Sequence, residues 1–167
     1  LPLPRATASR AELLDYFDNT WTLTEVLFAG LQGEEPFYRP PYHDLRHPMV
    51  FYYGHPACLY VNKLRVAGLL DGAVNLPFEL IFETGVDEMT WDDLSKNFSA
   101  WPSIAAVRAY RAQVYAKVRD VILHDPSFET FAAAKRPEDH PFWSVLMGFE
   151  HERIHVETVK LSADALG

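Results

Sequence analysis

The chain has 167 residues, of which 49% are hydrophobic and 14% aromatic, and its formal net charge is −8. This length is enough for one well-buried core and short for two, so we expect a single domain over residues 1–167. The acidic balance, without a run of Lys or Arg, argues against nucleic acid or an anionic membrane as partner. No apolar run approaches about 20 residues, so no membrane span is expected.

The chain contains one cysteine, Cys58. A single cysteine cannot form an internal disulfide, which fits a reducing compartment such as the cytoplasm. Cys58 follows His55 by three residues, and we favour a small buried hydrophobic role for it over that of a ligand or reactive thiol. The first residues show neither an initiator Met nor a signal peptide, so we expect a trimmed or excised chain.

Apolar residues recur at helical spacing along four stretches, and no stretch alternates as a strand would. A capping box formed by Ser9 and Glu12 begins the first helix, and Ser103 caps the third. The four long helices are expected at residues 10–30, 47–70, 103–124 and from Pro141 onward.

The connections between these helices differ in length. Residues 34–42 contain three prolines and are expected to form an extended crossing loop rather than a helix. Residues 71–102 are expected to be irregular apart from a short helix that begins at Thr90. The sequence therefore predicts an all-α fold, a four-helix bundle with long crossover loops, whose metal sites would be built by facing helices.

Two histidines, His151 and His155, lie four residues apart in the last predicted helix. At 3.6 residues per turn their imidazoles lie one above the other, which suits one divalent ion. The pair continues an apolar stripe through Phe142 and Phe149, so we expect it to face the core, where a histidine needs a partner. A pair of surface histidines is the alternative.

The segment also matches the zinc-peptidase pattern His-Glu-x-x-His, in which Glu152 would be the general base. That class needs a third ligand downstream, and no histidine follows His155. We therefore disfavour a peptidase and expect the third ligand upstream.

His55 is the best candidate for the third ligand because it lies in the middle of a long apolar helix. His47 is its rival, but it lies about 80° round the helix and two turns away, so it cannot easily share the ion. Three neutral imidazoles leave open coordination positions, which is typical of a catalytic metal site. Imidazole suits zinc, iron, nickel and copper alike.

Glu157 lies two residues past His155, about 200° round the helix, and is a poor ligand for the same ion. We consider it a candidate for a hydrogen bond to a neighbouring ligand at the rim of the site. A solvated acid is the alternative.

These residues resemble those of a known family, the non-haem iron sulfoxide synthases of thiol-histidine biosynthesis, whose N-terminal part is a DinB-like four-helix bundle. The likeness is strongest to the ovothiol branch, the 5-histidylcysteine sulfoxide synthases, and runs from about residue 11 to residue 158. The segments that carry it are residues 18–21, 38–48, 51–55, 82–89 and 151–155, with Glu157.

The resemblance implies an Fe(II) ion held by His55, His151 and His155, with zinc or nickel possible in an isolated domain. It implies a reaction that joins the sulfur of cysteine to the imidazole of histidine with O2, giving a sulfoxide on the way to ovothiol. Family members continue into a formylglycine-generating-enzyme-like domain, and usually a methyltransferase domain, which this sequence does not include. We therefore expect a metal-binding domain with little synthase activity alone.

Two other functions fit the same residues. A stand-alone DinB-like thiol transferase would use the three histidines to hold zinc or nickel and activate a small thiol. A non-enzymatic helical bundle would use them only as structural side chains.

Overall fold

The structure, a computed structural model, describes residues 3–41, 46–83 and 101–164, and all secondary structure in these ranges is helical. None of the described helices combines the length and apolarity needed to span a membrane. The all-α prediction is confirmed. The elements are α1 (Arg10–Ala29), α2 (Glu35–Tyr38), α3 (Met49–Val66), α4 (Leu76–Phe82), α5 (Ile104–His124), α6 (Phe128–Phe131), the 3₁₀ helix η2 (Pro137–Asp139) and α7 (Trp143–Asp164).

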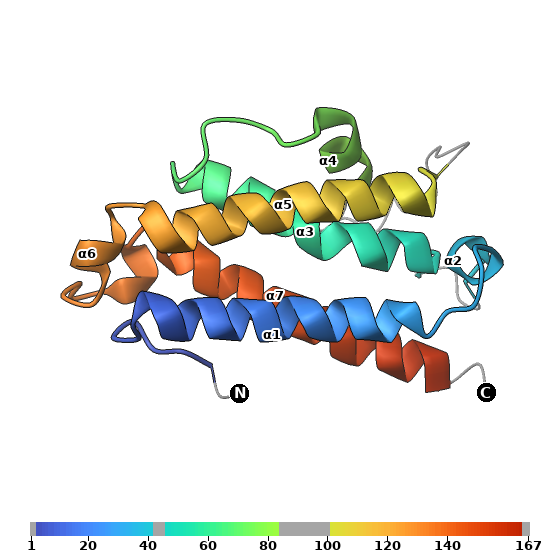
Figure 1. The fold of residues 1–167 in the computed structure, drawn as a ribbon, viewed down its shortest axis with the longest axis horizontal. Coiled ribbons are helices and arrows are strands. Elements are labelled where there is room, and N and C mark those ends of the chain that lie inside the picture. The colour runs from blue at the N-terminus through green and yellow to red at the C-terminus, as the bar shows by residue number, and fades with distance from the viewer. Residues whose placement is uncertain (1–2, 42–45, 84–100, 165–167) are drawn as a thin grey trace.

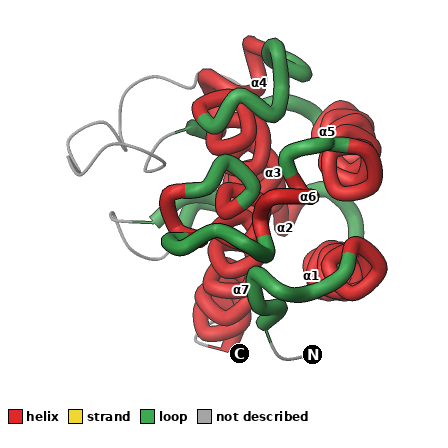
Figure 2. The backbone as a smooth tube through the Cα atoms, turned by 90° about the vertical axis from the view of Figure 1, so that its left-hand side faces the viewer, coloured by secondary structure: helices red, strands yellow, loops and turns green. Residues whose placement is uncertain are grey.

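Four long helices lie side by side and enclose the core (Figure 1). Helices α1 and α7 run in one direction, and α3 and α5 run in the other. Helix α3 packs on α7 and α5, and α1 packs on the same two helices. Seen along the long axis, α1 and α5 lie on one side and α3 and α7 on the other (Figure 2). This contact pattern is typical of a four-helix bundle.

The helix ends follow from local chemistry. At the start of α1 the Ser9 N–H donates to Glu12 Oε2, and the Glu12 N–H donates to Ser9 Oγ, which is the predicted capping box. Ser103 Oγ caps α5. Helix α3 ends earlier than the predicted range because Gly68, with φ of +74°, turns into the left-handed region. There the Leu69 N–H bonds back to the Leu64 carbonyl.

Two predictions for the connections are wrong. Residues 34–42 are not wholly extended, because α2 forms one helical turn with Pro36 in its first turn, where a missing N–H costs nothing. Residues 71–102 contain α4, whose N-cap Asn75 accepts from the Phe78 N–H. Helix α4 packs on α3. The short helix expected from Thr90 lies outside the described residues.

Two glycines allow close approaches within this core. A Cβ at Gly54 of α3 would overlap the ring of Phe82, the last residue of α4. A Cβ at Gly148 of α7 would overlap the ring of Tyr60 on α3. Both rings are fully buried, so neither can move aside cheaply. The two glycines therefore set the distances of α4 and α7 from α3.

Replacing Gly148 with alanine is expected to destabilise the fold by about 1–3 kcal/mol, because the Tyr60 ring cannot yield without moving α3. The gain in helix propensity, about 1 kcal/mol, offsets only part of this loss. Urea unfolding followed by circular dichroism measures the change. Gly72→Ala is the control, since its Cβ meets open space. A Gly148→Ala protein as stable as the parent would contradict the close-packing argument.

Candidate metal centre

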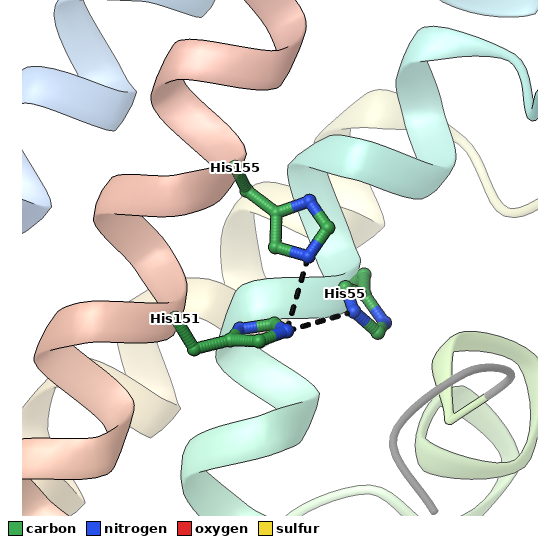
Figure 3. Close-up of side chains that lie close together, drawn as sticks. All are labelled: His55, His151 and His155. Carbon is green, nitrogen blue, oxygen red and sulfur yellow. Dashed lines mark hydrogen bonds between the residues drawn. The ribbon is translucent and has the colours of Figure 1, made fainter. Parts of the chain in front are cut away.

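Three histidines from two helices meet between α3 and α7 (Figure 3). His55 comes from the middle of α3, and His151 and His155 come from successive turns of α7. His151 Nε2 lies 3.2 Å from His55 Nε2 and 3.0 Å from His155 Nε2. In the described part of the chain, no other group of three or more His, Cys, Asp or Glu side chains converges in this way. The structure thus brings all three predicted ligands together.

Hydrogen bonding among the three rings cannot account for this arrangement. His55 Nδ1 lies 2.7 Å from the Phe82 carbonyl oxygen, which only accepts, so this nitrogen carries the proton of the neutral ring. His55 Nε2 then presents a lone pair to His151. A single proton on His151 Nε2 cannot form good hydrogen bonds to both neighbours, whereas a cation between the three nitrogens attracts all three lone pairs.

The spacing of the nitrogens suits a metal ion. Two imidazole nitrogens bound about 2.1 Å from one ion lie about 3.0–3.4 Å apart at bond angles of about 90–109°. The two distances from His151 Nε2, 3.0 and 3.2 Å, fall in this range. The Nε2 atoms of His151 and His155 face the ion position, whereas their buried Nδ1 atoms have no partner among the described residues. All three ligand nitrogens lie within 4.8 Å of one another, so His55, His151 and His155 form a candidate site for one metal ion.

Burial also sets the protonation state of the three rings. It lowers the pKa of His55 to about 4, that of His155 to about 3 and that of His151 to about 2. Burial is the largest cause of each shift, and the neighbouring imidazoles contribute to the low pKa of His151 and His155. All three are neutral at pH 7, as a metal ligand must be.

Helix α4 orients the first of these rings. Phe82 ends α4, and its carbonyl accepts the Nδ1–H bond that directs His55 Nε2 toward α7. This contact depends on Gly54, which leaves room for the Phe82 ring against α3. An outer hydrogen bond of this kind fixes the ring orientation of a metal-binding histidine.

Glu152 does not face the histidine cluster. Its carboxylate is fully buried, accepts hydrogen bonds from Thr24 and Tyr60, and forms an ion pair with Arg111. Burial raises the pKa of this carboxyl, while the Arg111 charge and the hydrogen bonds oppose the rise. A general base has to reach a water on the metal, and Glu152 is engaged elsewhere. The arrangement therefore disfavours a zinc peptidase, as the sequence predicts.

The remaining candidates lie outside the cluster. His47 is buried and packs at a tilt against Phe51, with ring centroids 4.0 Å apart, and Phe51 in turn stacks on the His55 ring. Cys58 is buried, and its thiol contacts the Glu79 carbonyl of α4. Glu157 is exposed on α7, and its hydrogen bond to a neighbouring ligand stays a prediction.

Comparison with known proteins identifies the family of this chain. The sequence matches the DinB superfamily over residues 16–159, which is most of the chain. The chain belongs to the DinB superfamily. Over 151 residues it is also 25% identical to Ergothioneine biosynthesis protein 1 of Neurospora crassa. That alignment covers 87% of this chain but 16% of the fungal protein, so the chain spans a small part of its relative's length.

Sequence reasoning missed two residues next to this histidine cluster. Phe82 contributes through a backbone carbonyl, which carries no side-chain signal. Arg111 is fully buried in α5, where its place in the apolar stripe of residues 107, 110, 114 and 118 was the available signal. A charged residue among core positions of a helix is expected to be buried and to need a partner of opposite charge. The sequence does not show which acidic residue is that partner.

The metal-free protein is expected to lose stability as the pH falls from about 7 to 5.5. The three imidazoles titrate near 6.5 when unfolded and well below that when folded, so the unfolded chain binds more protons in this interval. Each contributes up to about 1.4 kcal/mol per pH unit below 6.5. Urea unfolding with a chelator measures the slope. His155→Gln should reduce it and the exposed His124→Gln should not; equal slopes in all three proteins would refute the assignment.

Proposed function

We propose that the chain is the metal-binding domain of a non-haem Fe(II), O2-dependent sulfoxide synthase of thiol-histidine biosynthesis. The observation that carries this proposal is the convergence of three neutral imidazoles, His55, His151 and His155, at nitrogen spacings of 3.0 and 3.2 Å. Three ligands leave positions open for substrates, which distinguishes a catalytic site from a closed structural one.

The relative from Neurospora crassa supports the same class, because its name assigns it to ergothioneine biosynthesis. Ergothioneine and ovothiol are both thiol derivatives of histidine. We propose the ovothiol branch, with cysteine and histidine as substrates, on the motifs around Tyr53-Gly54-His55 and His151-x-x-x-His155.

The proposed reaction balances with one O2. Joining a cysteine thiol to an imidazole C–H releases two electrons and two protons, and oxidation of the new thioether to a sulfoxide releases two electrons. One oxygen atom ends in the sulfoxide and the other in water. Iron, when bound, supplies the redox chemistry and the sites at which thiolate and O2 meet.

The residues of this chain hold and orient the ion in the proposed reaction. His55, His151 and His155 bind as neutral donors, and the Phe82 carbonyl keeps the Nδ1 proton of His55 away from the ion. The aromatic side chains of Phe51 and Tyr52 pack against the imidazoles on α3 and α7. We propose that a formylglycine-generating-enzyme-like domain supplies the groups that bind cysteine and histidine.

Anaerobic reconstitution with Fe(II), followed by elemental analysis, tests the metal centre. We expect about one iron per chain in the parent protein and loss of this iron in His55→Ala, since two imidazoles on one helix hold the ion much less tightly. His124→Ala is the matched control, because His124 is exposed and pairs only with Asp120 among the described residues. It should retain the iron.

The outcomes separate the candidate functions. Iron lost in His55→Ala and retained in His124→Ala supports the synthase proposal, which then requires cysteine–histidine sulfoxide formation by the protein carrying its catalytic partner domain. Stoichiometric zinc or nickel that Fe(II) cannot replace favours a DinB-like thiol transferase. Equal metal content in both variants, or none in the parent, contradicts the three-histidine centre.

A further inference from the structure

Arg111 of α5 joins the four long helices at a single buried point. Its guanidinium is 1% exposed and lies over the rings of Trp21 and Tyr53, at 4.1 and 4.8 Å from their centroids. Its Nε donates to Glu25 of α1 at 2.7 Å, and its Nη1 donates to the Tyr53 carbonyl of α3 at 2.9 Å. Its Nη2 lies 3.3 Å from Glu152 of α7.

Among the partners of Arg111, Glu152 has a carboxylate that is surrounded by hydrogen-bond donors. Thr24 Oγ1 donates to its Oε1 at 2.8 Å, and the Tyr60 hydroxyl donates to its Oε2 at 3.1 Å. With Arg111, every contact comes from a donor, and an ionised carboxylate accepts all of them. A neutral amide in the same place would turn an N–H₂ group toward one of these donors, so the charge itself matters to the geometry.

The network of Arg111 and Glu152 is linked to the metal-site histidines through Glu152, which lies next to one of them in the sequence. Glu152 directly follows His151, so a contact that fixes Glu152 also fixes the rotation of α7 about its axis. A rotation by one residue, about 100°, would turn both α7 histidines away from His55. On α3 the contacts fall at Tyr53 and Tyr60, on either side of His55.

We propose that Arg111 and Glu152 are positioning residues for the three-histidine centre. Their ion pair, with the hydrogen bonds to Tyr53 and Tyr60, holds α7 in the rotation in which His151 and His155 face His55. Neither side chain touches the metal position, and both act through the helices that carry the ligands. This inference rests on the proposed metal centre.

Glu152→Gln tests the inference, with Co(II) alone as the probe. In the folded variant we expect Co(II) to bind about 10- to 100-fold more weakly, the range found when outer partners of metal ligands are removed. The d–d absorption spectrum of bound Co(II) should change as well, because the angle between the imidazoles changes.

Two controls separate positioning from stability. Glu150→Gln makes the same substitution one residue before His151, on the exposed side of α7, and should leave affinity and spectrum unchanged. Val118→Ala removes core volume on α5, about 10 Å from Arg111 along the helix, and should lower stability without altering Co(II) binding.

The outcomes distinguish a failure of the positioning role from a failure of the proposed metal centre. A folded Glu152→Gln protein with the affinity and spectrum of the parent overturns the positioning role, even if it is less stable. If this variant does not fold, Tyr60→Phe removes only the hydrogen bond to Oε2, and an unchanged Co(II) affinity there overturns the role equally. A parent protein without His55-dependent Co(II) binding refutes the proposed centre itself, which is a different failure.

Discussion

The buried guanidinium of Arg111 is the interaction on which the arrangement of the long helices depends, because it bonds to α1, α3 and α7 from α5. Removing one partner of a buried ion pair costs about 3–5 kcal/mol, a large share of the 5–15 kcal/mol that typically holds a domain together. Replacing a buried ion pair with apolar side chains of similar volume can leave the protein equally stable. Apolar contacts are not directional, however, whereas hydrogen bonds are, and directional bonds can set the rotation of a helix about its axis.

The close approaches at Gly54 and Gly148 add a second constraint. They fix the distances of α4 and α7 from α3, whereas Arg111 fixes the rotation of α7 about its axis. Gly148 lets α7 pack directly on Tyr60, whose hydroxyl then reaches Glu152. Gly54 lets α4 pack on α3, so that the Phe82 carbonyl reaches His55. Because α3 and α5 run in the same direction, the chain between them must return along the molecule. Helix α4 lies on that return, so the crossover itself contributes to the site.

How much of this could be predicted depends on how local each feature is. The i, i+4 pair on α7 and the capping box at Ser9 are set by neighbours within one turn, and the sequence alone predicts both. His55 was predictable because a histidine in a long apolar helix needs a partner. The two acidic partners of Arg111 could not be predicted, because sequence spacing carries no information on which buried charges meet. Glu152 lies 41 residues from Arg111, and Glu25 lies 86 residues from it. Helix α4 was missed because seven residues show too little periodicity.

The same geometry makes metal loading and folding depend on each other. Without a cation, the lone pairs of three imidazoles converge, so the centre opposes folding. A metal that binds only the folded chain removes this cost and stabilises it by about 4 kcal/mol at 1,000 times its Kd. The fold must therefore tolerate an unfavourable centre until the ion arrives, which it can do only if the helices are held from elsewhere. The contacts of Arg111 and Glu152 lie beside the centre but do not include the histidines, so they are complete before any metal binds.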